Sequence, residues 1–169
     1  LGLWFFAILL LFPRTEVQAA ENKGSATFIY GDREVTVAGL KRAWGVTPLI
    51  KYDGKTILFN SGGKEEILKH NLQVLGIEPK DLDAVVISHE HWEMYEAIGF
   101  IVEENNNIPI YTTDVTIQLL RDKNPEWEAN LLSVGRFVQF SPSIYFQNLR
   151  SGRRRGGPRG IDEVHIILK

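Results

Sequence analysis

The sequence predicts an α/β layered domain, and three observations carry this prediction. Apolar runs of strand length alternate with segments of helical spacing between residues 47 and 121. The pair Asp53-Gly54 separates two of these runs, which indicates a β-hairpin because Gly tolerates the positive φ of a tight turn. Residues 83–88 form a short and almost wholly apolar run, as expected of a strand that is buried on both faces.

Each expected element has a local signal in the sequence. Strands are expected where β-branched and aromatic residues gather, and helices where apolar residues recur at intervals of three or four. The expected strands are residues 25–30, 34–37, 47–52, 55–59, 83–88, 109–112 and 161–168, and the expected helices are residues 64–75, 92–103 and 115–121. Gly76 is placed to end the first of these helices.

The composition fits one globular domain and excludes several classes of protein. The chain has 169 residues, 44% apolar and 24% charged, so it is neither wholly disordered nor collagen-like. Its formal net charge of -2 argues against non-specific electrostatic binding to nucleic acid, and no nucleic-acid partner is expected. The sequence has no Cys, which excludes disulfides, thiolate metal sites and a cysteine nucleophile. Any metal ion must therefore be held by His, Asp or Glu.

The first residues have the pattern of a secretory signal peptide. Residues 1–12 are apolar apart from Gly2, but a membrane-spanning helix needs about 20 such residues, so no stable membrane span is expected. Residues 17–19 offer small side chains at the spacing of a cleavage site. This pattern predicts a signal peptide over residues 1–19, a mature domain over residues 20–169, and export to the periplasm or the extracellular space. The alternative is a buried helix of the domain.

The chemistry of the chain is expected where the buried strand at residues 83–88 ends. Alternate side chains of an extended chain point the same way, so His89, His91 and Glu93 can share one side. Two imidazoles and a carboxylate suit zinc or a similar ion and leave a position for water. Such an ion lowers the pKa of its water to about 7 and gives a nucleophile for hydrolysis. The alternative is that both histidines are simple loop residues, because a His-x-His pair alone is weak evidence.

The segment around these histidines resembles a known family. Residues 89–94, His-Glu-His-Trp-Glu-Met, lie between a strand and a helix and resemble the His-x-His-x-Asp-His signature of the metallo-β-lactamase superfamily. Residues 56–63 resemble that family's strand ending in Asp-Thr-Gly, and residues 70–83 match its stand-alone metal-dependent hydrolases in content and spacing. The resemblance covers residues 35–168 and is strongest over residues 46–100.

This resemblance implies a four-layer αββα sandwich with one or two zinc ions at one edge. His89 and His91 correspond to the ligands of the first ion, Glu93 and Met94 to residues that help to bind a second ion, and Asn60 to a residue that orients the site. A third histidine ligand of the family lies on a later strand, so about the first half of the sandwich is expected here. Half a sandwich leaves an apolar sheet face uncovered, which favours a second copy or a C-terminal half as partner.

The motif is degenerate at three positions. Glu93 stands where the family has Asp, which keeps the carboxylate but lengthens the side chain by one methylene. Met94 stands where the family has His, and a thioether suits copper(I) better than a hard hydrolytic metal, so at most one ion is expected. Asn60 replaces Asp and carries no charge to raise the basicity of a ligand. His165 lies within the expected last strand and is interpreted as a strand residue.

Three functions stay open on this evidence. The first is an exported metal-dependent hydrolase, with reduced activity if the motif is impaired and with a small-molecule substrate that is not identified. The second is a degenerate, non-catalytic member that serves as a binding or scaffold domain. The third is a nucleic-acid-binding module built on an arginine cluster, which in the hydrolase could instead attract an anionic substrate. That cluster consists of Arg150, Arg153, Arg154, Arg155 and Arg159.

Overall fold

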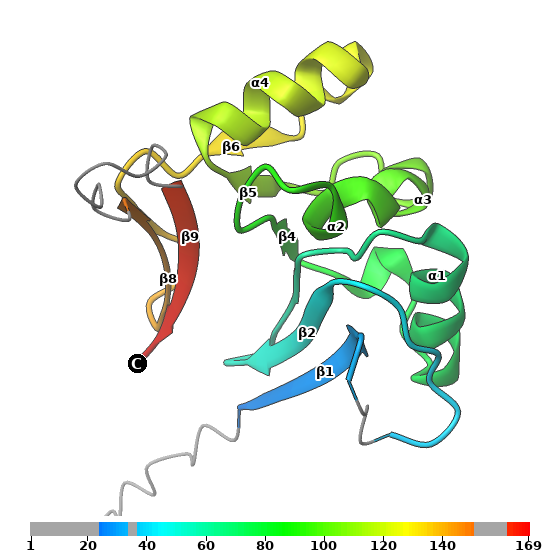
Figure 1. Cartoon of the computed structure of the whole chain (residues 1–169). Coiled ribbons are helices and arrows are strands. Elements are labelled where there is room, and N and C mark those ends of the chain that lie inside the picture. Colours follow the sequence, from blue (N-terminus) through cyan, green and yellow to red (C-terminus); the bar gives the residue numbers. More distant parts are fainter. Residues whose placement is uncertain (1–23, 34–36, 151–161) are drawn as a thin grey trace, which may run out of the picture.

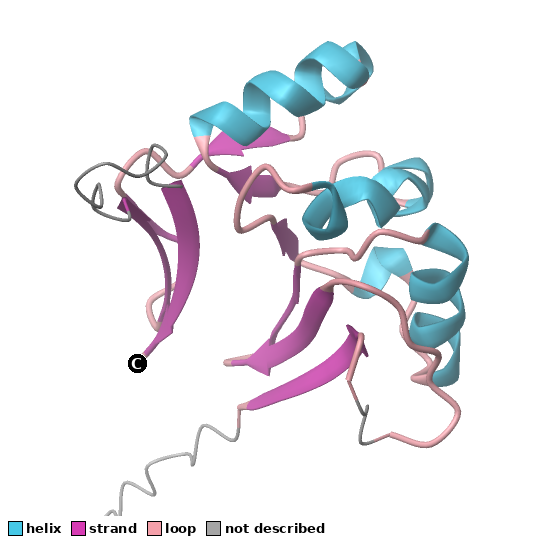
Figure 2. Cartoon of the chain, viewed as in Figure 1, coloured by secondary structure: helices cyan, strands magenta, loops and turns pink. Residues whose placement is uncertain are grey.

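Two β-sheets face each other in the structure, and helices cover the outer side of the larger sheet (Figure 1; Figure 2 colours the same view by secondary structure). The structure is a computed structural model that describes residues 24–33, 37–150 and 162–169. The expected signal peptide, the expected strand at residues 34–37 except its last residue, and the arginines at 153–159 lie outside these ranges.

The larger sheet contains six strands and carries the hairpin and the buried strand that the sequence predicts. Its strands, in spatial order, are β1 (Ser25–Gly31), β2 (Val46–Tyr52), β3 (Lys55–Phe59), β4 (Ala84–Val86), β5 (Ile110–Thr112) and β6 (Leu131–Ser133). The first three strands pair antiparallel, whereas β3 to β6 run parallel. Parallel strands end at the same edge, so residues that follow β3 and β4 come together there.

The turn between β2 and β3 has the predicted hairpin geometry. Asp53 and Gly54 adopt φ values of 51° and 70°, and Tyr52 pairs directly with Lys55. Two positive φ values in succession give the two-residue turn whose twist matches that of the flanking strands. Asp and Gly therefore set the register of β2 against β3.

The helices lie on one face of the larger sheet, where apolar side chains of both layers form the main core. They are α1 (Glu65–Val74), α2 (Trp92–Tyr95), α3 (Gly99–Glu104) and α4 (Asp114–Lys123), with short 3-10 turns η1 (Pro79–Asp81), η2 (Glu96–Ile98) and η3 (Pro125–Trp127). Leu58 and Val85 point from the sheet into this core, where Leu68 of α1 and Ile101 of α3 are fully buried. Alternation along the strands sends Ile57 and Val86 to the opposite face.

The continuous helix expected over residues 92–103 is wrong, because the structure breaks it into α2, η2 and α3. Ala97 has non-helical angles of φ -89° and ψ 15°, and its N–H donates to the carbonyl of Gly62 at 3.0 Å. This bond takes the donor that an uninterrupted helix would use within itself. A contact with the loop after β3 therefore ends α2 one turn after the candidate metal ligands.

The smaller sheet covers the second face of the larger one. It consists of β7 (Phe137–Gln139), β8 (Ile144–Arg150) and β9 (Asp162–Leu168), all antiparallel. Phe146 and Val164 from its inner face are buried against Ile57 and Val86 of the larger sheet. The face of the larger sheet that was expected to be open is thus covered, and the described residues build three successive layers of helices, sheet and sheet.

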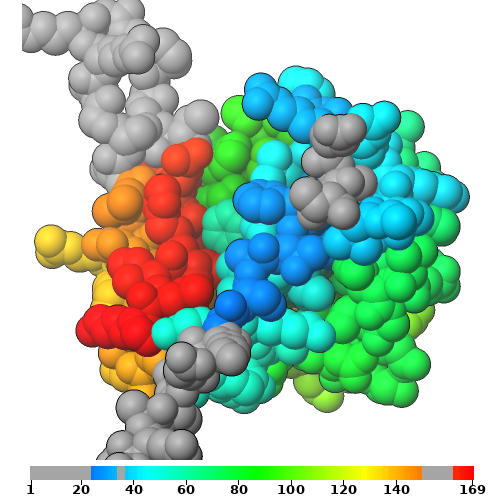
Figure 3. Space-filling view, turned by 90° about the horizontal axis from the view of Figure 1, so that it is seen from below, coloured from blue at the N-terminus to red at the C-terminus, as the bar shows by residue number. Residues whose placement is uncertain are grey.

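The residue after β9 also contacts the larger sheet, at the edge where β2 ends and β3 begins. This edge lies opposite the one where the parallel strands β3 and β4 end. The hydroxyl of Tyr52 donates a hydrogen bond to the carbonyl of Lys169. Figure 3 shows the last residues, in red, beside the cyan and blue residues of the first strands. None of the helices in the described part of the chain combines the length and the apolar character that crossing a membrane requires.

Candidate metal site

The candidate metal site lies where the chain leaves β4, at the edge shared by the ends of the parallel strands. Ile87 and Ser88 continue the strand direction and remain buried, and His89 follows with a side chain that is 12% exposed. His91 then stands directly before α2. The prediction that residues 89–93 emerge at the end of a buried strand is therefore confirmed.

The two imidazole rings face each other across this edge. Their centroids are 4.6 Å apart with an interplanar angle of 71°. Nε2 of His89 lies 3.1 Å from Nδ1 of His91, so a nitrogen of each ring points at the other. The rings thus share one side of the backbone, as the alternation of side chains predicts.

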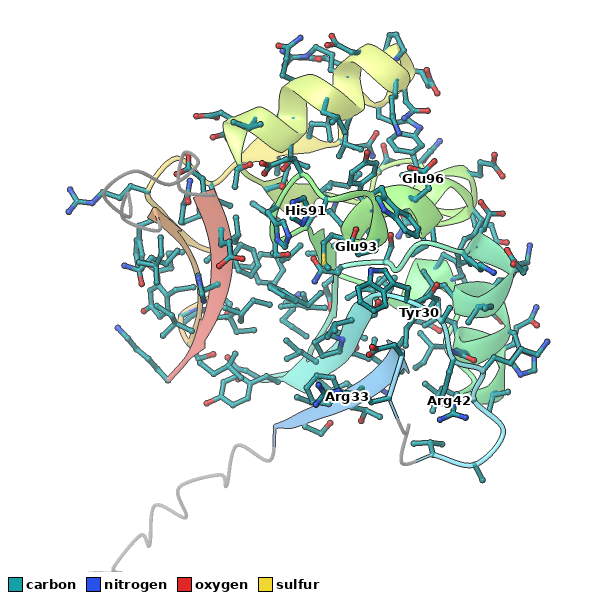
Figure 4. The ribbon with its side chains drawn as sticks, in the orientation of Figure 1. Tyr30, Arg33, Arg42, His91, Glu93 and Glu96 are labelled. Atoms are coloured by element: carbon teal, nitrogen blue, oxygen red, sulfur yellow. The ribbon has the colours of Figure 1, made fainter. Side chains whose placement is uncertain are left out.

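Glu93 lies beside this pair in the first turn of α2. Its Oε1 is 3.9 Å from Nδ1 of His91, and its side chain is 15% exposed. Figure 4 shows His91 and Glu93 close together, whereas Glu96 lies farther from His91. Glu96 instead bonds Nζ of Lys123 in α4 at 3.1 Å, so only the first of these two carboxylates belongs to the site.

Two further groups approach the other nitrogen of His89. The hydroxyl of Ser88 is 2.9 Å from Nδ1, and Oε1 of Glu163 in β9 is 3.7 Å from it. The N–H of Val164 donates to the carbonyl of Ser88 at 2.9 Å, which holds β9 against the end of β4. Glu163 was not predicted from the sequence, because it lies far along the chain and only the docking of β9 brings it to the site.

His165 also lies beside Glu163. Nε2 of His165 lies 3.9 Å from Oε2 of Glu163, and the two side chains are alternate residues of β9. His165 is exposed and belongs to the strand, as the sequence predicts. The carboxylate of Glu163 therefore stands between an inner and an outer imidazole.

Burial keeps His89 uncharged. Removal from solvent lowers the pKa of His89 below its ordinary value of 6.5, and the neighbouring His91 lowers it further. The carboxylates of Glu163, Glu90 and Glu93 act in the opposite direction on the same pKa. Since the net shift is downward, the neutral ring, which is the form that binds a metal ion, prevails at neutral pH.

Asn60 supports the strand end without touching either histidine. It has a positive φ of 60°, a conformation that Asn tolerates better than most residues, and its side chain is buried. Its Oδ1 accepts the N–H of Ser88 at 2.8 Å, and its Nδ2 donates to the carbonyl of Val46 at 3.2 Å. Asn60 thus fixes the backbone immediately before His89.

Met94 belongs to the protein interior more than to the histidine pair. Its side chain packs against the main core, and it borders a hollow of about 170 Å³ beside Glu93. The other residues that line this hollow are Asp32, Trp44, Gly45 and Val46. The hollow offers an apolar recess next to the site.

The two ring nitrogens are close enough for one zinc ion to reach both if the rings turn toward it. Zinc to nitrogen distances of about 2.0–2.1 Å in a tetrahedral site hold two nitrogens about 3.4 Å apart, close to the 3.1 Å between His89 and His91. Among the described residues, no three metal-ligating side chains already surround a common point. The arrangement therefore brings two imidazole nitrogens together, with one carboxylate beside them.

Comparisons with known proteins place this architecture. No family model matches the chain. A structure described as a new diphosphatase from the PhnP family superposes with a TM-score of 0.61 at 15% identity, over 85% of this chain and 61% of that chain. The metallo-β-lactamase fold protein YhfI from Bacillus subtilis superposes with a TM-score of 0.58 at 16% identity, over 86% of this chain and 58% of that chain. The chain has the metallo-β-lactamase fold.

Curated sequence relatives match shorter stretches of the chain. Ribonuclease TTHA0252 of Thermus thermophilus is 29% identical over 91 residues, which are 52% of this chain and 21% of that protein. The 7,8-dihydropterin-6-methyl-4-(beta-D-ribofuranosyl)-aminobenzene-5'-phosphate synthase of Methanocaldococcus jannaschii is 34% identical over 58 residues, or 34% of this chain and 20% of that protein. The chain matches about a fifth of each curated relative and about three fifths of each metallo-β-lactamase fold structure above.

Proposed function

We propose that the chain is a metal-dependent hydrolase of the metallo-β-lactamase superfamily, with His89 and His91 as metal ligands. The observation that carries the proposal is the pair of ring nitrogens, Nε2 of His89 and Nδ1 of His91, that face each other at 3.1 Å. The pair follows β4 in a chain with the metallo-β-lactamase fold, and solved structures similar to this chain include ones described as a diphosphatase and a lactonase.

The residues of the site divide the work of such a hydrolase. When bound, zinc supplies Lewis acidity and makes water reactive at neutral pH. His89 and His91 would hold the ion, and Ser88 and Asn60 fix the first of them through its ring and its backbone. Glu93, with a largely buried carboxylate 3.9 Å from His91, is placed to accept a proton from a water molecule at the site.

Zinc binding by the purified chain tests the ligand assignment. We expect about one zinc per chain by elemental analysis after dialysis, and its loss in the His89→Ala, His91→Ala double variant. His70→Ala is the matched control, because His70 lies in α1 and bonds the carbonyl of Gly39 away from the site. Absence of bound zinc in the wild type at saturating zinc would contradict the proposal, as would equal zinc in the double variant.

Phosphate esters are the first substrates to test. A diphosphatase is among the structural matches and a ribonuclease among the sequence relatives, and an arginine cluster that could attract an anionic substrate favours the same class. We expect zinc-dependent cleavage of bis(p-nitrophenyl) phosphate that is lost in His89→Ala. Zinc binding without cleavage of esters of phosphate, carboxylate or thiol would contradict the proposed hydrolase activity.

A non-catalytic binding or scaffold role is the second candidate. It is favoured by the absence, within the described ranges, of three side chains gathered around one metal position, and by Met94 packing into the core. This role predicts a stable fold that neither binds zinc tightly nor cleaves any ester. The zinc measurement therefore separates the two candidates.

We further propose that the chain is exported, on the basis of the apolar residues 1–12 and the small side chains at 17–19. N-terminal sequencing of secreted protein tests this proposal. We expect a start at Ala20, whereas an unprocessed start at Leu1 would count against export by a cleaved signal.

A further inference from the structure

We infer that Glu163 is a positioning residue that fixes the tautomer of His89, with the proton on Nδ1 and the lone pair on Nε2 toward His91. The inference rests on the proposed metal-binding function, in which Nε2 must be free to bind an ion. It concerns a residue of β9, outside the motif at residues 89–94.

The hydrogen bonds of His89 alone leave its tautomer open. The hydroxyl of Ser88, 2.9 Å from Nδ1, can either donate to this nitrogen or accept from it. Nδ1 of His91, 3.1 Å from Nε2 of His89, has the same freedom because it belongs to a second imidazole. Two consistent networks therefore exist, one for each tautomer of His89.

The carboxylate of Glu163 distinguishes the two networks. An ionised carboxylate only accepts hydrogen bonds, and Oε1 lies 3.7 Å from Nδ1, so it favours an N–H there and opposes a lone pair. His89 is 12% exposed and Glu163 is 42% exposed, so water screens this electrostatic preference only from the carboxylate side. With the proton on Nδ1, the hydroxyl of Ser88 becomes an acceptor, and Nε2 keeps a lone pair that accepts from His91 or binds an ion.

Main-chain structure holds Glu163 in this position. Val164 donates its N–H to the carbonyl of Ser88 at 2.9 Å, and its side chain is buried between the two sheets. Glu163 pairs with Leu149 of β8, and this register fixes the position of Glu163 along the sheet. The carboxylate therefore reaches Nδ1 from a backbone that is fixed on both sides.

The effect expected on a metal site is that of an outer carboxylate on a histidine ligand. Such carboxylates orient the ring, fix its tautomer and raise its basicity, and their loss weakens metal affinity by about 10- to 100-fold. Glu163 would act in this way through His89 without contacting the ion. The fold thus uses a residue of the second sheet to prepare a ligand at the edge of the first.

Tautomer measurement in the metal-free full chain tests the inference. Protein labelled with 15N-histidine is studied above pH 8, where imidazoles are neutral, by long-range 1H–15N correlation spectra. We expect His89 of the wild type as the Nδ1–H form, and a shift toward the Nε2–H form in Glu163→Ala and, to a smaller extent, in Glu163→Gln. His165→Ala is the matched control, since it removes the other neighbour of Glu163 from the same strand.

The outcomes are decisive in each case. A wild-type His89 in the Nε2–H form overturns the inference even if the variants fail to fold, and so does an unchanged tautomer in folded Glu163→Ala. Zinc titration forms the second arm, where Glu163→Ala should weaken affinity by about 10- to 100-fold and His165→Ala should not. A wild type that binds no zinc contradicts the proposed function alone, because the tautomer measurement is made without metal.

Discussion

Asn60 accepts the N–H of Ser88 at 2.8 Å and so holds the backbone directly before the first histidine of the site. The same side chain donates its amide to the carbonyl of Val46 at 3.2 Å. A carboxylate at this position could accept from Ser88 but could not donate to Val46. Asn in place of the Asp of the family pattern therefore has a structural role, because its amide links the start of β2 to the residues after β4.

Asn60→Asp is expected to lower the free energy of unfolding by about 1–3 kcal/mol at pH 7, because it leaves a buried carboxylate facing a carbonyl oxygen. Burial would raise the pKa of this Asp above its value in the unfolded chain, so the folded state binds more protons. The free energy of unfolding of the variant therefore falls further as pH rises from the unfolded to the folded pKa. Urea unfolding at pH 7 and pH 5 measures both effects. Asn107→Asp, an exposed change of the same charge, is the control. Equal stability of Asn60→Asp and wild type at pH 7 would refute the role of the amide.

Gly63→Ala is expected to displace Trp92. A Cβ on Gly63 would lie 2.1 Å from the Trp92 ring, which is half exposed and can swing away. We expect the free energy of unfolding to fall by about 1–3 kcal/mol and the tryptophan fluorescence to shift. In a Trp92→Ala background, Gly63→Ala should have little effect on either quantity. Gly135→Ala, where a Cβ meets nothing closer than 3.9 Å, is the control. Additive losses in the double variant would show that the ring is not the obstacle.

Tyr111→Phe is expected to make the protein less sensitive to alkali. Burial raises the pKa of the Tyr111 hydroxyl above its ordinary value of 10.0, so the folded state keeps a proton that the unfolded state releases. The stability of the wild type therefore falls as pH rises above 10, and Tyr111→Phe removes this part of the fall. Its ring contacts with Phe140 and Phe146 are retained in the variant. Thermal unfolding between about pH 8 and pH 11 measures the difference, and parallel curves for the two proteins would disprove it.

Glu93→Gln is expected to weaken zinc binding by about 10- to 100-fold and to reduce any zinc-dependent hydrolysis, because it removes the negative charge beside His91. Glu96→Gln makes the same change in the next turn, on a carboxylate that bonds Lys123 outside the site, and should leave zinc affinity unchanged. Isothermal titration with zinc compares the two variants. Equal affinity in Glu93→Gln and wild type would exclude Glu93 from the metal site.

Local signals predicted the parts of the fold that depend on neighbours in sequence. The hairpin at Asp53 and Gly54 and the buried strand β4 are confirmed, because turn chemistry and apolar runs act over a few residues. The break at Ala97 was missed, because it depends on a bond to Gly62 that only tertiary structure provides. β8 was also missed, although the alternation of Ile144 and Phe146 could have indicated it.

The candidate site divides in the same way. The shared side of His89 and His91 follows from two-residue alternation, and the structure confirms it. The position of Asn60 behind the site was expected from the family pattern, but its bond to Val46 was not. Glu163 carries no local signal, since its approach to His89 depends on how β9 docks against β4.

The hydrogen bond between Val164 and Ser88 also sets an order of events during synthesis. Its partners lie far apart along the chain, and contacts of long sequence separation form late because closing a long loop costs entropy. A growing polypeptide that has released β4 and α2 from the ribosome can already bring His89 beside His91. It gains Glu163 only after β9 has emerged, so the histidine pair acquires its neighbouring carboxylate later in translation than the pair itself can form.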